Sequence, residues 1–292
     1  KTKDIKINPI PGVKLMRKAL PIDSVGLYIP GGTAPLFSTV LMLGVPAKLA
    51  GCRNIVMCTP CDHEGNINPA ILYSAEVLGI DRIIKVGGAQ AIAAMAFGTE
   101  SVPKVDKIFG PGNQYVTMAK LLVSQQGVAI DMPAGPSELA VLADTTAIPE
   151  YVASDLLSQA EHGTDSQVIL VSTSGRIIKS VWAEINKQMN SLPRKHIIEK
   201  SLLHSIFIQV KSLEEGIELL NLYAPEHLIL AVKNPEKMAL RVKNAGSVFL
   251  GNHSPESAGD YASGTNHTLP TNGYARAFSG ISLESFMKFI TL

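Results

Sequence analysis

Two polar residues at the end of a predicted helix have the types and spacing of metal ligands. Gln159 and His162 are three residues apart in the stretch SQAEHGTDSQVIL. At this spacing two side chains share one face of a helix, and Gly163 is a natural end for that helix. Two ligands from one helical turn, completed by a carboxylate from elsewhere, commonly hold zinc. The alternative is a His that complements the helix dipole beside a solvated Gln.

Glu226 and His227 are adjacent and follow Pro225, immediately before an apolar run that predicts a strand. A Glu beside a His is suited to acid–base chemistry, because burial can tune both pKa values towards neutrality. Consecutive side chains of a regular strand point to opposite faces of the sheet. A shared site therefore predicts non-strand geometry at this dipeptide.

The segment 251–271 is a polar stretch rich in Gly and Ser that follows a predicted strand. A loop of this length inside a compact domain is usually functional. Its ionisable residues are His253, Glu256, Asp260 and His267. We predict Asp260 as a third metal ligand and His267 as a further group of the site, with a solvated loop as the alternative for any one of them.

Three Gly-containing turns in the first half each lead from a predicted strand into a predicted helix, at 28–36, 85–93 and 109–117. The free N–H groups and the dipole at a helix N-terminus favour an anion, which suits a nucleotide pyrophosphate. None of the turns has the GxGxxG pattern, so tight turns that need positive φ are the alternative. Tyr28, Gln90 and Asn113 lie in these turns, where they could bind a nucleotide or cap their own loops.

The stretch 52–63 contains Cys52, Cys58, Cys61 and His63, which suggests a zinc or redox site. No second CxxC exists to complete a four-thiolate zinc site. Because free Cys is commonly buried as a small hydrophobe, we favour a structural role for these residues.

The elements that must position these residues alternate along the chain. Predicted strands cover 24–29, 54–58, 82–86, 107–110 and 127–131, and then 138–144, 167–172, 205–210, 227–232 and 247–251. Predicted helices cover 36–50, 68–79, 88–97, 112–124, 149–162, 176–190, 212–223 and 235–244, and the stretch 283–289 is helix-like. This alternation predicts an α/β fold with two mainly parallel, helix-covered sheets that meet near 131–139. In such sheets ligands bind beyond the carboxyl ends of the strands.

Composition excludes several classes of protein. Hydrophobic residues make up 46% and charged residues 17% of the 292, as in a chain with a substantial core. The 26 Lys and Arg nearly balance the 25 Asp and Glu, so neither a nucleic acid nor a membrane surface is an expected partner. The three cysteines, an odd number, fit a reducing cytoplasm rather than a disulfide scaffold.

Long stretches of the chain resemble the histidinol dehydrogenase family. They are SVGLYIPGG, VGGAQAIAAMAFGTESVPKVDKIFGPGN, IDMPAGPSE, ASDLLSQAEHGTDSQVIL, YAPEHLI and GSVFLGNHSPESAGDYASGTNHTLPT. These stretches cover nearly the whole chain and fall in the order of the family. The resemblance implies a zinc-dependent enzyme that oxidises L-histidinol through the aldehyde to L-histidine with two NAD, in the last steps of histidine biosynthesis.

The resemblance also implies roles for individual residues. The implied zinc ligands, for one Zn²⁺ per subunit, are Gln159, His162 and Asp260, and the implied catalytic pair is Glu226 and His227. Ser137 and His267 are implied substrate contacts, joined by Gln159, His162, His227 and Asp260, and Tyr28, Gln90 and Asn113 are the implied NAD-binding residues.

The family resemblance implies two incomplete Rossmann-like domains and a homodimer. It assigns 28–136 to the NAD-binding domain, 1–27 with 137–281 to the zinc and substrate domain, and 282–292 to the start of a truncated C-terminal tail. Family members continue past the position of Leu292 into a tail that supplies the partner subunit with a zinc-binding His and a substrate-binding Glu. We therefore expect the chain to be a piece of a longer protein.

Three alternatives remain open from the sequence. A relative with the same zinc and NAD chemistry could oxidise another small alcohol. A non-catalytic zinc-binding protein could have kept the fold, although the Glu226 and His227 pair argues against it. A redox or metal-binding module at Cys58 and Cys61 is the third.

Overall fold

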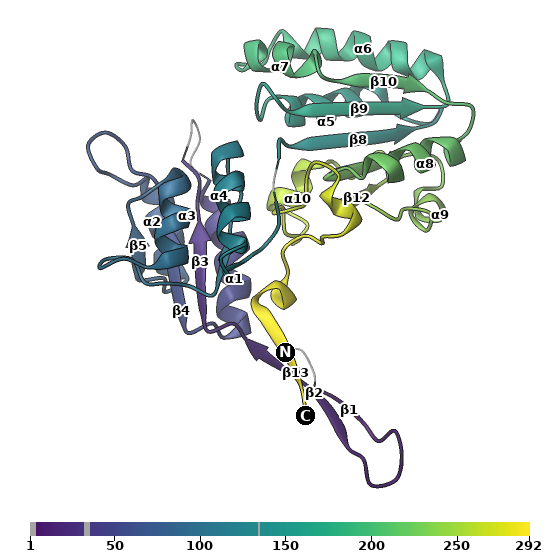
Figure 1. The fold of residues 1–292 in the computed structure, drawn as a ribbon. Helices are drawn as coiled ribbons and strands as arrows, with labels where there is room; N and C mark the ends of the chain where they lie inside the picture. Colours follow the sequence, from purple (N-terminus) through teal and green to yellow (C-terminus); the bar gives the residue numbers. More distant parts are fainter. Residues whose placement is uncertain (1–3, 32–35, 134) are drawn as a thin grey trace. The chain divides into compact units, whose positions relative to one another are not determined.

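The computed structural model describes residues 4–31, 36–133 and 135–292 (Figure 1). The chain divides into two compact units. Unit 1 consists of residues 1–133 and 281–292, and unit 2 consists of residues 134–280.

Unit 1 contains a five-stranded parallel sheet in the order β5-β4-β3-β6-β7. Its strands are β3 (Ser24–Tyr28), β4 (Asn54–Cys58), β5 (Arg82–Ile84), β6 (Lys107–Phe109) and β7 (Ala129–Ile130). Its helices are α1 (Phe37–Ala50), α2 (Pro69–Val77), α3 (Gly88–Phe97) and α4 (Gln114–Ser124). One core cluster joins the sheet to α1 and α2, and a second joins it to α3 and α4. The sheet is therefore covered on both faces, as its continuous apolar strands predict.

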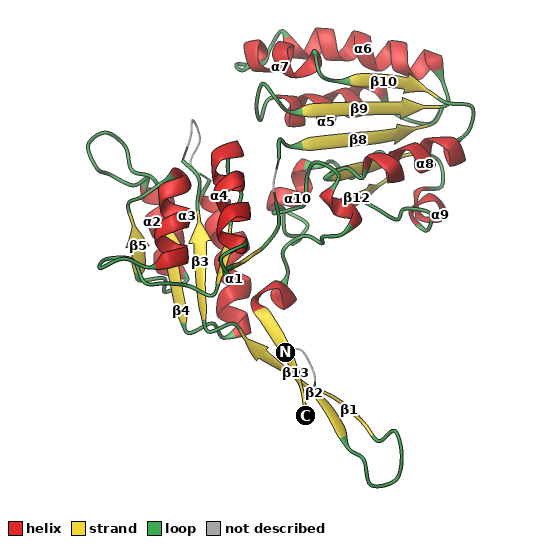
Figure 2. Ribbon diagram, in the orientation of Figure 1, coloured by secondary structure: helices red, strands yellow, loops and turns green. Residues whose placement is uncertain are grey.

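Unit 2 repeats this plan with a parallel sheet in the order β10-β9-β8-β11-β12 (Figure 2). Its strands are β8 (Glu138–Ala143), β9 (Gln167–Ser172), β10 (Ile206–Gln209), β11 (His227–Ala231) and β12 (Ser247–Leu250). Its helices are α5 (Pro149–Ala160), α6 (Gly175–Met189), α7 (Lys195–Leu202), α8 (Leu213–Tyr223), α9 (Pro235–Ala239) and α10 (Ser257–Tyr261). Helices α5, α6 and α7 cover one face, and α8 and α9 cover the other. The predicted fold class, two mainly parallel sheets covered by helices, is confirmed.

A three-stranded antiparallel sheet in unit 1 was not predicted. It joins β1 (Ile5–Ile7), β2 (Leu15–Pro21) and β13 (Met287–Thr291), and it extends away from the parallel sheet of the unit (Figure 1). The helix-like stretch 283–289 proves to be a 3₁₀ turn, Leu283–Phe286, that runs into β13. Phe286 is buried in the core of unit 1 and stacks on Phe109 with 3.9 Å between ring centroids. Tertiary packing thus overrides the local helical pattern.

Three helices of unit 2 differ from the prediction. The helix expected over 235–244 ends at Ala239, and α7 occupies a stretch for which no element was predicted. Helix α10 lies inside the segment predicted to be a loop. Both α9 and α10 have only five residues, too few to produce a periodic pattern in the sequence.

The compact units also differ from the predicted domain boundaries. Residues 1–27 and 282–292 belong to unit 1, whereas the family resemblance assigned the first to the zinc domain and the second to a tail. The reason is pairing: β3 starts at Ser24 in the centre of the first sheet, and β13 pairs with β2. In the described part of the chain no helix is long and apolar enough to cross a membrane.

A buried ion pair fixes the end of the first sheet. Lys120 of α4 is 1% exposed, pairs with Asp131, and donates hydrogen bonds to the carbonyls of Gly110 (3.0 Å) and Met132 (2.9 Å). Asp131 in turn accepts a hydrogen bond from the Gly110 N–H at 2.8 Å. Lys120 therefore binds the carbonyl of Gly110, and Asp131 binds its N–H.

Lys120→Met is expected to lower the free energy of unfolding by about 3–5 kcal/mol, because it leaves the Asp131 carboxylate buried without a counter-ion. Denaturant unfolding of the purified protein measures this loss. Lys120→Met combined with Asp131→Asn serves as the control and should lose clearly less. A loss below about 1 kcal/mol in the single variant would contradict the argument.

Candidate active site

The predicted catalytic residues lie at the amino ends of the strands of unit 2. His227 is the first residue of β11 and pairs in parallel register with Leu139 of β8. Glu226 and Glu138 each come one residue before this pair, so both lie at the same amino edge of the sheet. The C-terminal end of α5, which carries Gln159, reaches this edge because a crossover helix runs antiparallel to its strands. The general expectation that ligands bind beyond the carboxyl ends of strands does not hold for this group of residues.

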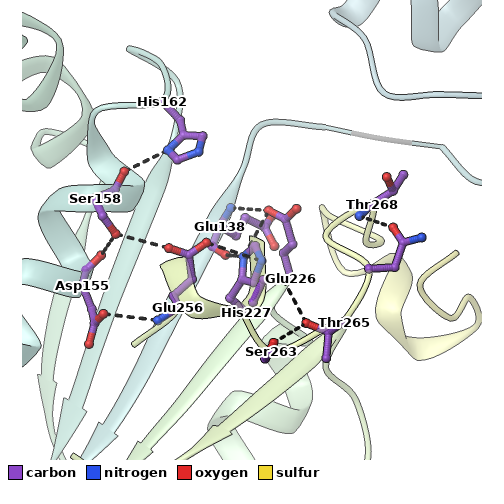
Figure 3. Close-up of polar contacts among 12 residues, drawn as sticks. Glu138, Asp155, Ser158, His162, Glu226, His227, Glu256, Ser263, Thr265 and Thr268 are labelled. Carbon is purple, nitrogen blue, oxygen red and sulfur yellow. Dashed lines mark hydrogen bonds and ion pairs between the residues drawn. The ribbon is translucent and has the colours of Figure 1, made fainter. Parts of the chain in front are cut away.

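Glu226 and His227 point toward one another despite being adjacent in sequence (Figure 3). Glu226 Oε2 lies 3.7 Å from His227 Nδ1, and both side chains are buried. The regular strand begins only at His227, and Ala224 ends α8 in the left-handed conformation with φ 58°. The predicted departure from strand geometry at Glu226 is thus present.

The backbone of Glu138 holds both members of the pair. Its N–H donates a 3.0 Å hydrogen bond to Glu226 Oε2, and its carbonyl lies 3.3 Å from His227 Nδ1. The Glu138 side chain accepts a 2.9 Å hydrogen bond from the Asn272 N–H, while its second oxygen, Oε2, is buried and has no partner in the part of the chain that the structure describes. Glu138 therefore ties the catalytic pair to the end of the segment 251–271.

The predicted metal ligands include a side chain without a hydrogen-bond partner among the described residues. Gln159 is 1% exposed, and neither its Oε1 nor its Nε2 has a partner in this part of the chain. Buried amides are almost always paired, so two orphaned atoms on one side chain call for a ligand. The Nδ1 of His162 lies 2.8 Å from the Ser158 carbonyl, which leaves its Nε2 available.

The other two predicted groups of the site, Asp260 and His267, interact electrostatically with each other and with His162. Burial raises the pKa of Asp260, and His267 and His162 partly oppose that rise. His267 Nε2 is buried and finds no partner among residues 4–31, 36–133 and 135–292, and burial lowers the pKa of this ring. Among the described residues no three His, Cys, Asp or Glu side chains form a ready metal cluster. The imidazole and carboxylate of the predicted ligand set are usual zinc donors, and the buried Gln159 amide offers a further oxygen donor.

Further carboxyl groups lie around His227. Glu256, at the start of α10, has its Oε1 3.7 Å from His227 Nε2 and accepts a 3.2 Å hydrogen bond from the Ser158 hydroxyl (Figure 3). Its N–H donates to Asp155 of α5 at 3.3 Å. These contacts place the segment 251–271 against α5 and against the catalytic pair.

Burial decides the charge states in this site. It lowers the pKa of His227 to about 4, so the ring is neutral and able to accept a proton at pH 7. It raises the pKa of Glu226 well above its ordinary value. Burial likewise raises the pKa values of Glu138 and Glu256 to about 7, and that of Asp155 to about 6.

Glu138→Gln is expected to stabilise the metal-free protein increasingly as the pH rises. Because the pKa of Glu138 rises from 4.5 to about 7 on folding, the folded state holds a proton that the unfolded chain has lost within this window. The free energy of unfolding of the wild-type protein therefore falls as the pH rises between these values. The Gln variant shows no such fall from this position, because Gln does not ionise. The gain should reach up to about 3 kcal/mol at pH 8 relative to pH 4.5. Urea titrations of both proteins at the two pH values measure it, and an equal difference at both would contradict the argument.

The predicted NAD-binding residues lie at the carboxyl edge of the sheet of unit 1. Tyr28 ends β3, Gln90 is in the first turn of α3, and Asn113 caps α4. The Tyr28 hydroxyl accepts a 3.0 Å hydrogen bond from the Gly88 N–H, and Asn113 Oδ1 accepts from the N–H groups of Tyr115 and Val116. Asn113 thus caps its own turn, Tyr28 links the first Gly turn to the second, and Gln90 is exposed. Residues 32–35 of the first Gly turn lie outside the described residues.

The cysteines of 52–63 form no site. Burial raises the pKa of Cys52 to about 11 and that of Cys58 to about 12, so both remain thiols at neutral pH. Cys61 is exposed, and all three cysteines are free. Their geometry agrees with the structural role favoured from the sequence, because zinc and redox chemistry both need a thiolate.

Comparisons with known proteins decide the family. The family model described as histidinol dehydrogenase matches residues 1–292. The chain belongs to the histidinol dehydrogenase family. It is 65% identical over 286 residues to the histidinol dehydrogenase of Bacteroides thetaiotaomicron, covering 98% of this chain and 67% of that protein. A crystal structure of histidinol dehydrogenase from Elizabethkingia anophelis is 62% identical, with a TM-score of 0.98 over 100% of this chain and 67% of that one. The chain thus spans about two thirds of these relatives, and as a histidinol dehydrogenase it is an NAD-dependent oxidoreductase of histidine biosynthesis.

Other solved structures share the fold of this histidinol dehydrogenase at low identity. An NAD-dependent aldehyde dehydrogenase from Sinorhizobium meliloti has a TM-score of 0.64 at 13% identity, and covers 100% of this chain and 70% of that one. At this identity the similarity supports the α/β architecture alone.

Two residues of the candidate site were not predicted as members of it. Glu138 directly follows the predicted Ser137, and its backbone holds the catalytic pair. Glu256 was noted only as one of the ionisable residues of 251–271, yet it faces His227. Ser137 itself is half-buried, and its carbonyl accepts a 3.1 Å hydrogen bond from the Gln167 N–H.

Proposed function

We propose that residues 134–280 form the zinc- and substrate-binding centre of an enzyme that oxidises L-histidinol to L-histidine in two steps with two NAD. The observation that carries the proposal is the buried pair of Glu226 and His227, 3.7 Å apart, in the unit that contains the orphaned amide of Gln159. Histidinol is proposed as the substrate because the chain belongs to the histidinol dehydrogenase family.

Gln159, His162 and Asp260 are the residues that would hold zinc. When bound, zinc supplies a Lewis-acidic anchor that suits the amino and imidazole nitrogens of histidinol. Ser137 and His267 would add contacts to the substrate, and the unpartnered Nε2 of His267 is consistent with that role. Orientation by fixed groups converts binding energy into reaction rate.

His227 acts as the base in both oxidations. Its neutral ring would remove the hydroxyl proton of histidinol while a hydride leaves the carbon that bears this hydroxyl, and bound NAD would supply the hydride acceptor. Glu226 then helps a water add to the resulting aldehyde, and His227 removes a proton from the diol in the second oxidation. The buried position of both side chains keeps bulk water away from the aldehyde.

The remaining partners belong to the same proposal. Tyr28, Gln90 and Asn113 would bind NAD at the carboxyl edge of the unit 1 sheet, where the N-terminus of α3 has no side-chain cap among the described residues. The enzyme would act in the cytoplasm as a homodimer whose sites are completed by the partner's C-terminal tail.

Counting the NADH formed per histidinol consumed tests the proposal. The purified, zinc-loaded enzyme, expressed with every residue that its gene encodes, should give two NADH per histidinol. One NADH, or faster turnover of another small alcohol at a matched concentration, would point to a different dehydrogenase. Zinc binding without any NADH would indicate a protein that kept the scaffold and lost the reaction.

A further inference from the structure

Glu256 faces the ring nitrogen of His227 that is available for catalysis. The Glu138 carbonyl can only accept a hydrogen bond, and it lies 3.3 Å from His227 Nδ1. Nδ1 is therefore the protonated nitrogen, and Nε2 carries the lone pair that takes up a proton. Glu256 Oε1 is 3.7 Å from this Nε2 (Figure 3).

A proton taken up by His227 needs a route out of the protein. The residue is only 6% exposed, and the proposed reaction uses the same ring as a base in each of two oxidations. The ring must return to its neutral form before the second oxidation begins. Glu226 lies on the Nδ1 side, where its Oε2 already accepts the Glu138 N–H. Of the two carboxyl groups beside the ring, only Glu256 faces Nε2.

We propose that Glu256 accepts the proton that His227 removes from the substrate and so resets His227 between the two oxidations. The inference rests on the proposed function. In this step the Nε2–H bond of the imidazolium breaks and an O–H bond forms on Glu256 Oε1. The imidazole becomes neutral, the carboxylate becomes a carboxylic acid, and no electrons are transferred. Glu256 thus acts through His227 as a positioning residue and proton acceptor.

The surroundings of Glu256 hold its carboxyl group in place for this role. The residue is 2% exposed, and the Ser158 hydroxyl donates to its Oε2 at 3.2 Å. Asp155 accepts the Glu256 N–H and so anchors the backbone. Ser158 is half-buried, and its hydroxyl also lies 2.9 Å from the Asp155 carbonyl. The 3.7 Å separation from Nε2 is longer than a hydrogen bond, and such contacts commonly tighten when substrate binds.

Glu256→Gln tests the proposal in the zinc-loaded enzyme expressed from its complete gene. Gln keeps the shape and still accepts the Ser158 hydrogen bond, but it does not take up a proton. We expect kcat to fall by about 100-fold, with KM for histidinol and for NAD within about threefold of wild type. In rapid-mixing experiments the variant should form the first NADH per site at nearly the wild-type rate and then stall.

Two further variants separate this role from a structural one. Glu150→Gln removes an exposed carboxylate from the same helix, α5, and should keep kcat within about threefold of wild type. Glu256→Ala should regain activity, by about tenfold or more, when formate is added, but not with chloride at equal ionic strength. Zinc content and melting temperature are measured for each variant.

The possible outcomes distinguish this inference from the proposed function. Two NADH from the wild-type enzyme with undiminished kcat in Glu256→Gln would overturn the inference alone. A loss of kcat that comes with loss of zinc, and that formate leaves unchanged in Glu256→Ala, would overturn it as well. No NADH from the wild-type enzyme would overturn the proposed function and this inference with it.

Discussion

His227→Ala is expected to lower kcat by about 10³-fold or more for histidinol and for the aldehyde offered separately as substrate. A positioned general base contributes about 10²–10⁴ to a rate, and here one ring serves both oxidations. Among the described histidines, His227 is the buried one. Its Nδ1 lies 3.3 Å from the Glu138 backbone carbonyl, which fixes the ring. Steady-state NADH production with each substrate measures the two losses.

The matched control for this variant is His253→Ala. His253 is exposed and contacts only the ring of Tyr151 among the described aromatic rings, so its removal should leave both rates within about twofold of wild type. If both rates of His227→Ala stay within about tenfold of wild type, His227 is not the general base.

Glu226→Gln separates the roles of the two adjacent residues. If Glu226 helps water to add to the aldehyde, the second oxidation should lose more activity than the first. Equal losses in both half-reactions would count against this division. The test is sharp because Gln can still accept the Glu138 N–H that now holds Glu226 Oε2.

The sequence predicted the side chains of this site better than it predicted their arrangement. The spacing of Gln159 and His162 and the adjacency of Glu226 and His227 are properties of the chain itself, so pattern and residue type identified them. The amino-edge location was not predicted, because the rule for open α/β sheets favours carboxyl ends. It follows from α8 ending at Tyr223, which brings Glu226 to the start of β11.

The role of Glu138 could not be found from its residue type. It acts on Glu226 and His227 through its backbone N–H and carbonyl, which every residue except Pro has in common. The same reason explains why β13 was missed: its partner β2 lies more than 250 residues away, and local sequence carries no signal for such a pairing. Chemistry-bearing side chains are visible in a sequence, whereas backbone contacts between distant segments are a product of the fold.

Gln159→Met is expected to stabilise the zinc-free protein and to remove its zinc site. A buried amide whose two polar atoms lack partners costs about 1–3 kcal/mol, and Met has a similar shape and helix propensity. The free energy of unfolding without zinc should therefore rise by about that amount. Zinc affinity should fall by at least about 100-fold, because even indirect partners of metal ligands cost about 10–100-fold.

The control is Gln167→Met, the same substitution at another glutamine of unit 2. The opposite change in the free energy of unfolding is expected for it. Gln167 accepts a 2.6 Å hydrogen bond from the Tyr223 hydroxyl and donates one of 2.6 Å to the His204 carbonyl. Its replacement should lower the free energy of unfolding by about 1–3 kcal/mol. Denaturant unfolding without metal and zinc titration calorimetry of both variants give the comparison. If Gln159→Met destabilises the zinc-free protein as Gln167→Met does, the Gln159 amide has partners in the protein and is no vacant ligand. If Gln159→Met stabilises the zinc-free protein and abolishes zinc binding, the Gln159 amide lowers the stability of the protein and is present because it binds the metal.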